Sequence, residues 1–178
     1  MEEKPGSAKQ PILAGASPEE RDPSRWPDSY FDPLERILRA SIERAGAAVQ
    51  ETFGRPERQM TAREFVQFWN GCRLKAMATV GPSGAPHIAP VHAEFANGQL
   101  YSTIYVDAQR RRDLAANPRV ALTTWDAAGA VAIVHGRAVE VPGSERGSRP
   151  GASGKRRRTV LLRIDIHRIY AMKGRDRT

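Results

Sequence analysis

The sequence has few of the residues that form covalent or metal cross-links. It contains one cysteine, Cys72, which excludes an internal disulfide, and its four histidines do not combine with that cysteine in the spacing of a zinc site. No apolar run approaches the roughly 20 residues that span a bilayer, and the first residues lack the charged-then-apolar order of a secretion signal. These absences predict a cytoplasmic protein with no metal site and no membrane partner.

The basic charge of the chain is concentrated in one stretch. There are 28 Lys and Arg residues against 20 Asp and Glu, which gives a formal net charge of +8. Six basic residues and one acid fall in the Gly-, Ser- and Pro-rich segment 143–158, so we predict a flexible basic loop there. The folded remainder is only mildly basic. This distribution disfavours nucleic acid as a partner and leaves polyanion binding by the loop as an alternative.

Composition divides the chain into regions. Residues 1–28 combine Pro, Gly, Ser and charge without apolar periodicity, and they predict a disordered tail. Residues 29–58 carry an amphipathic helix, residues 59–172 form the predicted main domain, and residues 173–178 are a short tail.

The helix within 29–58 has a clear predicted beginning. Asp32 is placed as the N-cap, Pro33 at the first helical position and Glu35 at the third. Apolar residues then recur at i, i+3, i+4 and i+7 from Leu34 to Val49, which predicts one face against a core or a partner. A second start pattern, from Thr61 to Glu64, predicts a helix that plugs the end of a barrel or packs on its wall.

From residue 73 the apolar period changes from 3.6 to 2, and tight turns separate the alternating runs. Short hairpins force antiparallel pairing, and a closed barrel removes exposed strand edges. The sequence therefore predicts a small barrel with a helix over 107–116 inserted between its third and fourth strands. The expected strands are 73–80, 86–95, 99–105, 120–125, 131–141 and a sixth that begins at residue 160.

The motifs of this region resemble a known family. A strand from Pro86 to His92, a strand reaching Thr103, a basic residue at Arg110 in the following helix and the run Asn117–Val120 occur in the order found in the pyridoxamine 5'-phosphate oxidase-like family of flavin-binding split barrels. The resemblance spans roughly residues 61–141. It implies a mainly β (α+β) fold, a six-stranded antiparallel split β-barrel with one inserted helix and N-terminal helices.

The same resemblance implies a homodimer that binds FMN in the cleft between its subunits. The flavin ring would lie along the second strand, largely against backbone groups, and the phosphate would lie near the start of the inserted helix. A guanidinium there can bind phosphate through two parallel hydrogen bonds. The implied cofactor-binding residues are His87, Ile88, Ala89, Pro90, Val91, His92, Thr103, Gln109 and Arg110.

Several positions depart from the family pattern. Ala108 stands where the family has a serine that contacts phosphate, and Asp107, read as the helix N-cap, would repel a phosphate unless Arg110 or Arg111 neutralises it. Val131 stands where the oxidase proper has a glutamine. The last strand also lacks that enzyme's substrate-binding signals, so pyridoxamine phosphate is not the expected substrate.

The leading hypothesis is an FMN-dependent oxidoreductase with a small-molecule substrate that the sequence does not identify. No catalytic residue is assigned, because the chemistry of such a site belongs to the flavin. The first alternative keeps the fold and binds the deazaflavin F420, whose polyanionic tail suits the basic loop. The others are a polyanion-binding module without catalytic activity, and a haem-binding barrel with the candidate axial ligands His87, His92, His135 and His167.

Overall fold

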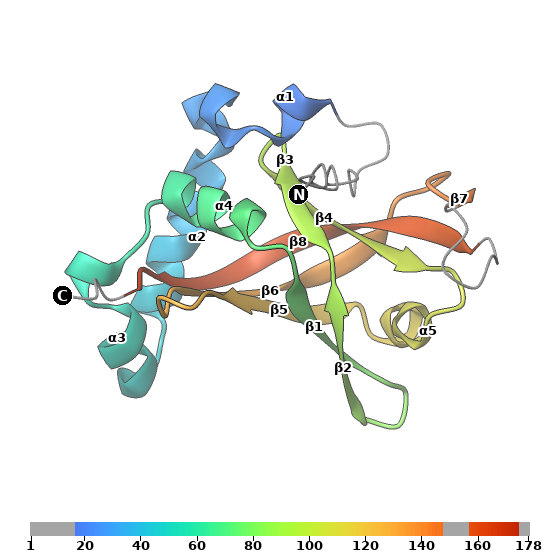
Figure 1. Cartoon of the computed structure of the whole chain (residues 1–178). Helices are drawn as coiled ribbons and strands as arrows, with labels where there is room; N and C mark the ends of the chain where they lie inside the picture. Colours follow the sequence, from blue (N-terminus) through green and yellow to red (C-terminus); the bar gives the residue numbers. More distant parts are fainter. Residues whose placement is uncertain (1–16, 148–156, 175–178) are drawn as a thin grey trace, which may run out of the picture.

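The computed structural model describes residues 17–147 and 157–174. An antiparallel sheet crosses the molecule, with helices α2, α3 and α4 gathered at one end and α5 at the other (Figure 1). The path of the sheet is β2-β1-β5-β6-β8-β4-β3, and β7 pairs with β8. The strands are β1 (Lys75–Val80), β2 (Pro86–Val91), β3 (Ala93–Ala96), β4 (Gln99–Tyr105), β5 (Arg119–Trp125), β6 (Val131–Glu140), β7 (Arg146–Gly147) and β8 (Arg158–Met172).

The first and last strands of this path are neighbours in the chain. β2 pairs with β1 and β3 pairs with β4, yet only His92 separates β2 from β3. The sheet must therefore curl until its two ends meet, which gives a half-barrel. At the junction the hydroxyl of the fully buried Ser102 donates to the carbonyl of His92 at 2.8 Å.

The predicted fold class is confirmed, but the strands are divided differently. The expected second strand, 86–95, changes partners at His92 and is two strands, and the two-residue β7 was not expected. Within residues 17–147 and 157–174 the sheet therefore has eight strand segments. Residues 148–156 of the predicted basic loop lie outside the described residues.

The helices are α1 (Pro18–Arg21), α2 (Asp32–Glu43), α3 (Ala47–Phe53), α4 (Ala62–Gly71) and α5 (Gln109–Ala116), with 3-10 turns at Pro23–Arg25, Asp28–Tyr30 and Pro56–Arg58. The predicted helix reaching Val49 is interrupted, because Gly46 caps a separate α3. None of the helices in 17–147 and 157–174 is long and apolar enough to cross a membrane.

One of the two predicted helix starts is correct. Thr61 accepts from the amide of Glu64, and the Glu64 carboxylate accepts from the amide of Thr61, which together form a capping box at α4. At α2 the N-cap is Phe31, without a side-chain bond. Glu35 instead accepts a hydrogen bond of 2.7 Å from the amide of Ala62, and this bond ties α2 to the first turn of α4.

Residues 17–28 differ from the predicted disordered tail. They form α1 and two 3-10 turns, and Trp26 is buried beside Phe31 with 5.7 Å between ring centroids. The Trp26 indole donates to the carbonyl of Glu20 at 3.1 Å. Burial of one large aromatic side chain supplies the ordering that average composition conceals. Residues 1–16 lie outside the described part of the chain.

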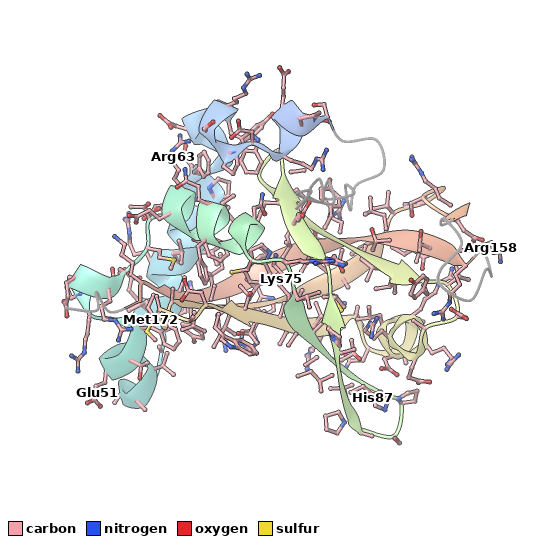
Figure 2. The ribbon with its side chains drawn as sticks, viewed as in Figure 1. Glu51, Arg63, Lys75, His87, Arg158 and Met172 are labelled. Atoms are coloured by element: carbon pink, nitrogen blue, oxygen red, sulfur yellow. The ribbon has the colours of Figure 1, made fainter. Side chains whose placement is uncertain are left out.

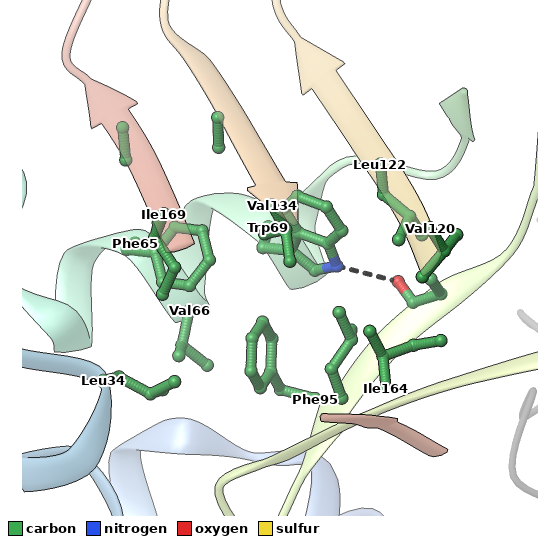
Figure 3. Close-up of a cluster of buried hydrophobic side chains, with 14 of the residues drawn as sticks. Leu34, Phe65, Val66, Trp69, Phe95, Val120, Leu122, Val134, Ile164 and Ile169 are labelled. Atoms are coloured by element: carbon green, nitrogen blue, oxygen red, sulfur yellow. Dashed lines mark hydrogen bonds between the residues drawn. The ribbon is translucent and has the colours of Figure 1, made fainter. Parts of the chain in front are cut away.

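The core fills the concave side of the curled sheet. Phe65 and Trp69 of α4 contact Phe95 of β3, and the Trp69 indole donates to the carbonyl of Ala93 at 3.1 Å (Figure 3). Leu34 of α2 belongs to the same buried cluster. Two placements were predicted for α4, plugging the end of the barrel or packing on its wall, and its contacts with the strands agree with packing against the sheet.

Replacing Ser102 by Ala tests the junction at His92. The substitution removes the hydroxyl of the fully buried Ser102 and leaves the His92 carbonyl without this donor, so we expect the free energy of unfolding to fall by about 1 kcal/mol. Urea unfolding with an unchanged m-value measures the loss. Ser24→Ala removes an exposed hydroxyl that bonds Asp22 and should cost less than about 0.5 kcal/mol. Equal losses in the two variants would show that the junction does not depend on this bond.

Candidate functional site

Strand β2 presents alternate residues to its two faces. His87 and Ala89 are half-buried and Val91 is buried in the core, whereas Ile88 and Pro90 are exposed. Ile88 retains 73% of its accessible surface, an unusual exposure for a large aliphatic side chain. The outer face of β2 is therefore apolar and open.

A cleft of about 350 Å³ lies along this outer face. Two exposed apolar side chains border it, Leu74 with 53% and Trp125 with 64% of its surface accessible. Lys75 also lines the cleft but is buried, with its ammonium group over the Trp69 ring and bonded to the carbonyl of Cys72. The complete lining is Leu74, Lys75, Ala76, Ile88, Ala89, Pro90, Thr124 and Trp125.

The opposite face of the β1–β2 hairpin contacts helix α5 through a buried carboxylate. Asp113 is completely buried and accepts hydrogen bonds from the Thr79 hydroxyl at 2.7 Å and the Gln109 amide at 2.9 Å. Nδ1 of His87 lies 2.8 Å from the same carboxylate. An ionised carboxylate only accepts, so the His87 proton is placed on Nδ1. Figure 2 shows His87 on this hairpin.

The surroundings of Asp113 favour its charged form. Burial by itself raises the pKa of this carboxyl, but hydrogen bonds from Gln109, His87 and Thr79, with the charge of His87, lower it by more. The net pKa lies below the ordinary aspartate value. Asp113 is therefore a buried anion stabilised by its donors.

The N-cap of helix α5 lies one residue later than predicted. It is Ala108, not Asp107, and it makes no side-chain hydrogen bond to the helix, while the amide of Arg111 donates to the Ala108 carbonyl at 3.1 Å. Asp107 is paired with Arg157, whose guanidinium lies 3.0 Å from one carboxylate oxygen and 3.9 Å from the centre of the Tyr105 ring. The charge of Asp107 is thus balanced by Arg157, a partner that the sequence did not predict.

The three arginines of α5 have different partners. Arg111 makes two bonds, of 2.8 and 2.9 Å, to the carboxylate of Glu140, and Arg112 bonds the side-chain oxygen of Gln109. Nε of Arg110 is buried and has no hydrogen-bond partner within the described residues. A buried donor without an acceptor lowers the stability of the fold, so a bound anion that accepts from this atom would be stabilising.

The structure brings some of the sequence-predicted residues together and separates others. Ile88, Ala89 and Pro90 share the cleft, and His87 and Gln109 meet at Asp113. The side chain of Val91 is in the core. The other predicted residues are in neither set of contacts: Arg110, with its buried Nε, follows Gln109 on α5, Thr103 is half-buried on β4, and His92 is exposed with Nδ1 3.1 Å from the carbonyl of Arg73.

Sequence reasoning missed Asp113 and Thr79. Asp113 is four residues after Gln109, so the two share one side of α5, and this spacing was an available signal. Thr79 could not be linked to them, because it is 34 residues from Asp113 in the chain. Over the described ranges, no group of three or more His, Cys, Asp or Glu side chains could hold a metal ion.

Comparisons with known proteins agree on the architecture. A family model described as pyridoxamine 5'-phosphate oxidase matches residues 61–173, and no curated protein matches the chain. A conserved hypothetical protein from Mycobacterium tuberculosis superposes with a TM-score of 0.55 at 18% identity, covering 67% of this chain and 88% of that chain. General Stress Protein 26 from Bacillus anthracis superposes with a TM-score of 0.52 at 20% identity, covering 65% and 97% respectively. At these identities the two structures show a shared fold.

Replacing Asp113 by Asn tests the buried anion. We expect the free energy of unfolding at pH 7 to fall by about 1–3 kcal/mol, because three donors lose a charged acceptor. The folded-state pKa is lowered, so this contribution is present above the unfolded-state pKa and is lost as the pH falls through the folded-state value. The stability curves of the two proteins should therefore converge below about pH 4.

Chemical unfolding at a series of pH values measures this difference. Asp28→Asn is the control, because its carboxylate is 94% exposed and pairs only with Arg63 among the described side chains. It should change stability little at neutral pH. A constant gap between the wild type and Asp113→Asn down to acid pH would contradict the lowered pKa.

Proposed function

Because the chain belongs to the pyridoxamine 5'-phosphate oxidase family, we propose that it is a flavin-dependent oxidoreductase that binds FMN in a cleft between two subunits. The observation that carries this proposal is the buried, unpartnered Nε of Arg110 on a helix whose first turn has no side-chain cap. Phosphate oxygens are acceptors that suit both a guanidinium and free helix amides. The residues present therefore fit an anionic cofactor tail.

The apolar cleft beside β2 suits the flat ring of the flavin. Ile88, Pro90 and Trp125 offer apolar surface to the ring, while the backbone of β2 can orient its polar edge. Bound FMN supplies the hydride chemistry. The chain's own residues bind the tail, orient the ring and exclude water from it.

A second copy of the chain is the proposed cover for this cleft. Leu74, Ile88 and Trp125 are large apolar side chains that are each more than half exposed at its margin. Contiguous exposed apolar surface of this kind marks an interface. A homodimer would bury these side chains and enclose the ring, as the family resemblance implies.

The alternative cofactor F420 is favoured by a different observation. Arg157, at the end of the basic segment, reaches the start of α5 and pairs with Asp107 there. This contact brings the end of the basic segment 143–158 beside the place where a longer anionic tail would pass. Ala108 also lacks the hydroxyl that the family uses for the phosphate. Pyridoxamine phosphate is not proposed as the substrate of either form.

The spectrum and mass of the copurified small molecule distinguish these proposals. A yellow protein with an absorption band near that of free FMN supports the leading proposal. A colourless protein that takes up F420 and not FMN supports the alternative. A Soret band after haemin titration, or salt-steep binding to a polyanion without cofactor uptake, would overturn both.

Replacing Arg110 by Ala tests the phosphate position. We expect the affinity for FMN to fall by about 10- to 100-fold, because a hydrogen bond to a charged group contributes about 1.5–3 kcal/mol. The affinity for riboflavin, which has no phosphate, should not change. Fluorescence titration of both ligands gives the comparison.

Arg39→Ala is the matched control for this experiment. It removes the same charge from an exposed position on α2 and should leave both affinities unchanged. Unchanged FMN affinity in the Arg110 variant would place the phosphate elsewhere.

A further inference from the structure

The hydrogen bonds of Asp113 join three separate elements. Thr79 belongs to β1, His87 to β2, and Gln109 to the first turn of α5. The proposed function uses β2 for the ring and the start of α5 for the phosphate. Asp113 is the group that bonds to both, yet its own carboxylate is fully buried and belongs to neither surface.

Strand β2 needs such a connection. It is the first strand of the sheet path, hydrogen-bonded in the described structure to β1 alone, and its hairpin extends away from the body of the molecule (Figure 1). Helix α5 packs on β1 and β4. Without a side-chain link, the position of β2 relative to α5 would depend on the hairpin alone.

The link is closely packed as well as hydrogen-bonded. A Cβ atom added at Gly81, which follows β1, would lie 3.1 Å from Cε1 of His87 and 3.5 Å from an oxygen of Asp113. The turn backbone therefore closes over the His87–Asp113 pair. The Asp113 carboxylate is buried, has three donors and is covered by the turn at Gly81. Its side chain and donors therefore have one favoured arrangement, because the loss of a donor would leave the buried charge less well stabilised.

We propose that Asp113 is a positioning residue of the cofactor site, which fixes the distance between β2 and the start of α5 through His87 and Gln109. This inference rests on the proposed function and adds a role that the resemblance does not assign. When a ring and a phosphate belong to one ligand, the second contact is intramolecular once the first has formed. The contribution of this second contact to affinity depends on how closely the distance between the ring subsite and the phosphate subsite matches the length of the ligand.

The test compares ligands that share a ring and differ in the phosphate. The dissociation constants of FMN and riboflavin are measured for wild type, Asp113→Asn and His87→Ala, all well below their melting temperatures. We expect the preference for FMN over riboflavin to fall about tenfold in both variants. This is the lower end of the roughly 10- to 100-fold loss of affinity that follows when a residue that orients binding groups is removed. If the wild type binds F420, that molecule and its phosphate-free chromophore replace the pair.

Two features separate positioning from general stability. A variant that is only less stable loses affinity for both ligands equally, so the ratio of the two constants would not move. His87→Ala cuts the link to β2 and leaves Asp113 its bonds to Thr79 and Gln109, which covers the case in which Asp113→Asn fails to fold. Glu140→Gln removes the acid partner of Arg111 on the same helix and should keep the wild-type ratio.

The outcomes are distinct. Wild-type protein that binds none of the four ligands removes the proposed function, and this inference with it. Wild-type protein that prefers the phosphorylated ligand, with the same preference in the Asp113 and His87 variants, overturns this inference and leaves the proposed function standing.

Discussion

The fold depends on a chain constraint at one residue. β2 and β3 occupy opposite ends of the sheet path, yet His92 alone connects them, so the sheet can satisfy both sets of strand pairs only by curling. The curl creates the concave face that α4 fills with Phe65 and Trp69. It also leaves β2 hydrogen-bonded to β1 alone among the described strands, and the outer face of β2 lines the apolar cleft. The barrel interior and the candidate site are therefore two results of the same closure.

Local sequence patterns predicted the positions of helices and strands better than they predicted which strands and side chains pair. The period-2 runs and the Thr61–Glu64 box are short-range signals, and the structure contains both. The break at His92 has no such signal, because burial continues to alternate from Pro90 through Ala93 while the pairing partner changes. The predicted start of α2 was wrong for a related reason, since Glu35, expected at the third position of the helix start, bonds across 27 residues to the amide of Ala62.

Ion pairing explains why a run of three arginines does not act as one cationic patch. Glu140 binds Arg111 through both of its oxygens, and Asp107 takes Arg157 from far along the chain. A count of charges near α5 would sum all these cations, whereas in the part of the chain that the structure describes the Nε of Arg110 is a buried donor without an acceptor. The burial of Asp113 was also not predictable from composition, because RRRD at the start of a helix has the composition of a solvated face, and only its spacing from Gln109 was a signal.

The N-terminal helices are integral to the hydrophobic core. Trp26, Phe31 and Leu34 lie in one continuous cluster with β-strand residues, and Glu35 binds the backbone of α4. The portion matched by the family model starts at residue 61, so it excludes all of these groups. That portion in isolation would expose the apolar surfaces they cover. The segment before residue 61 therefore shares one hydrophobic core with the family-matched region.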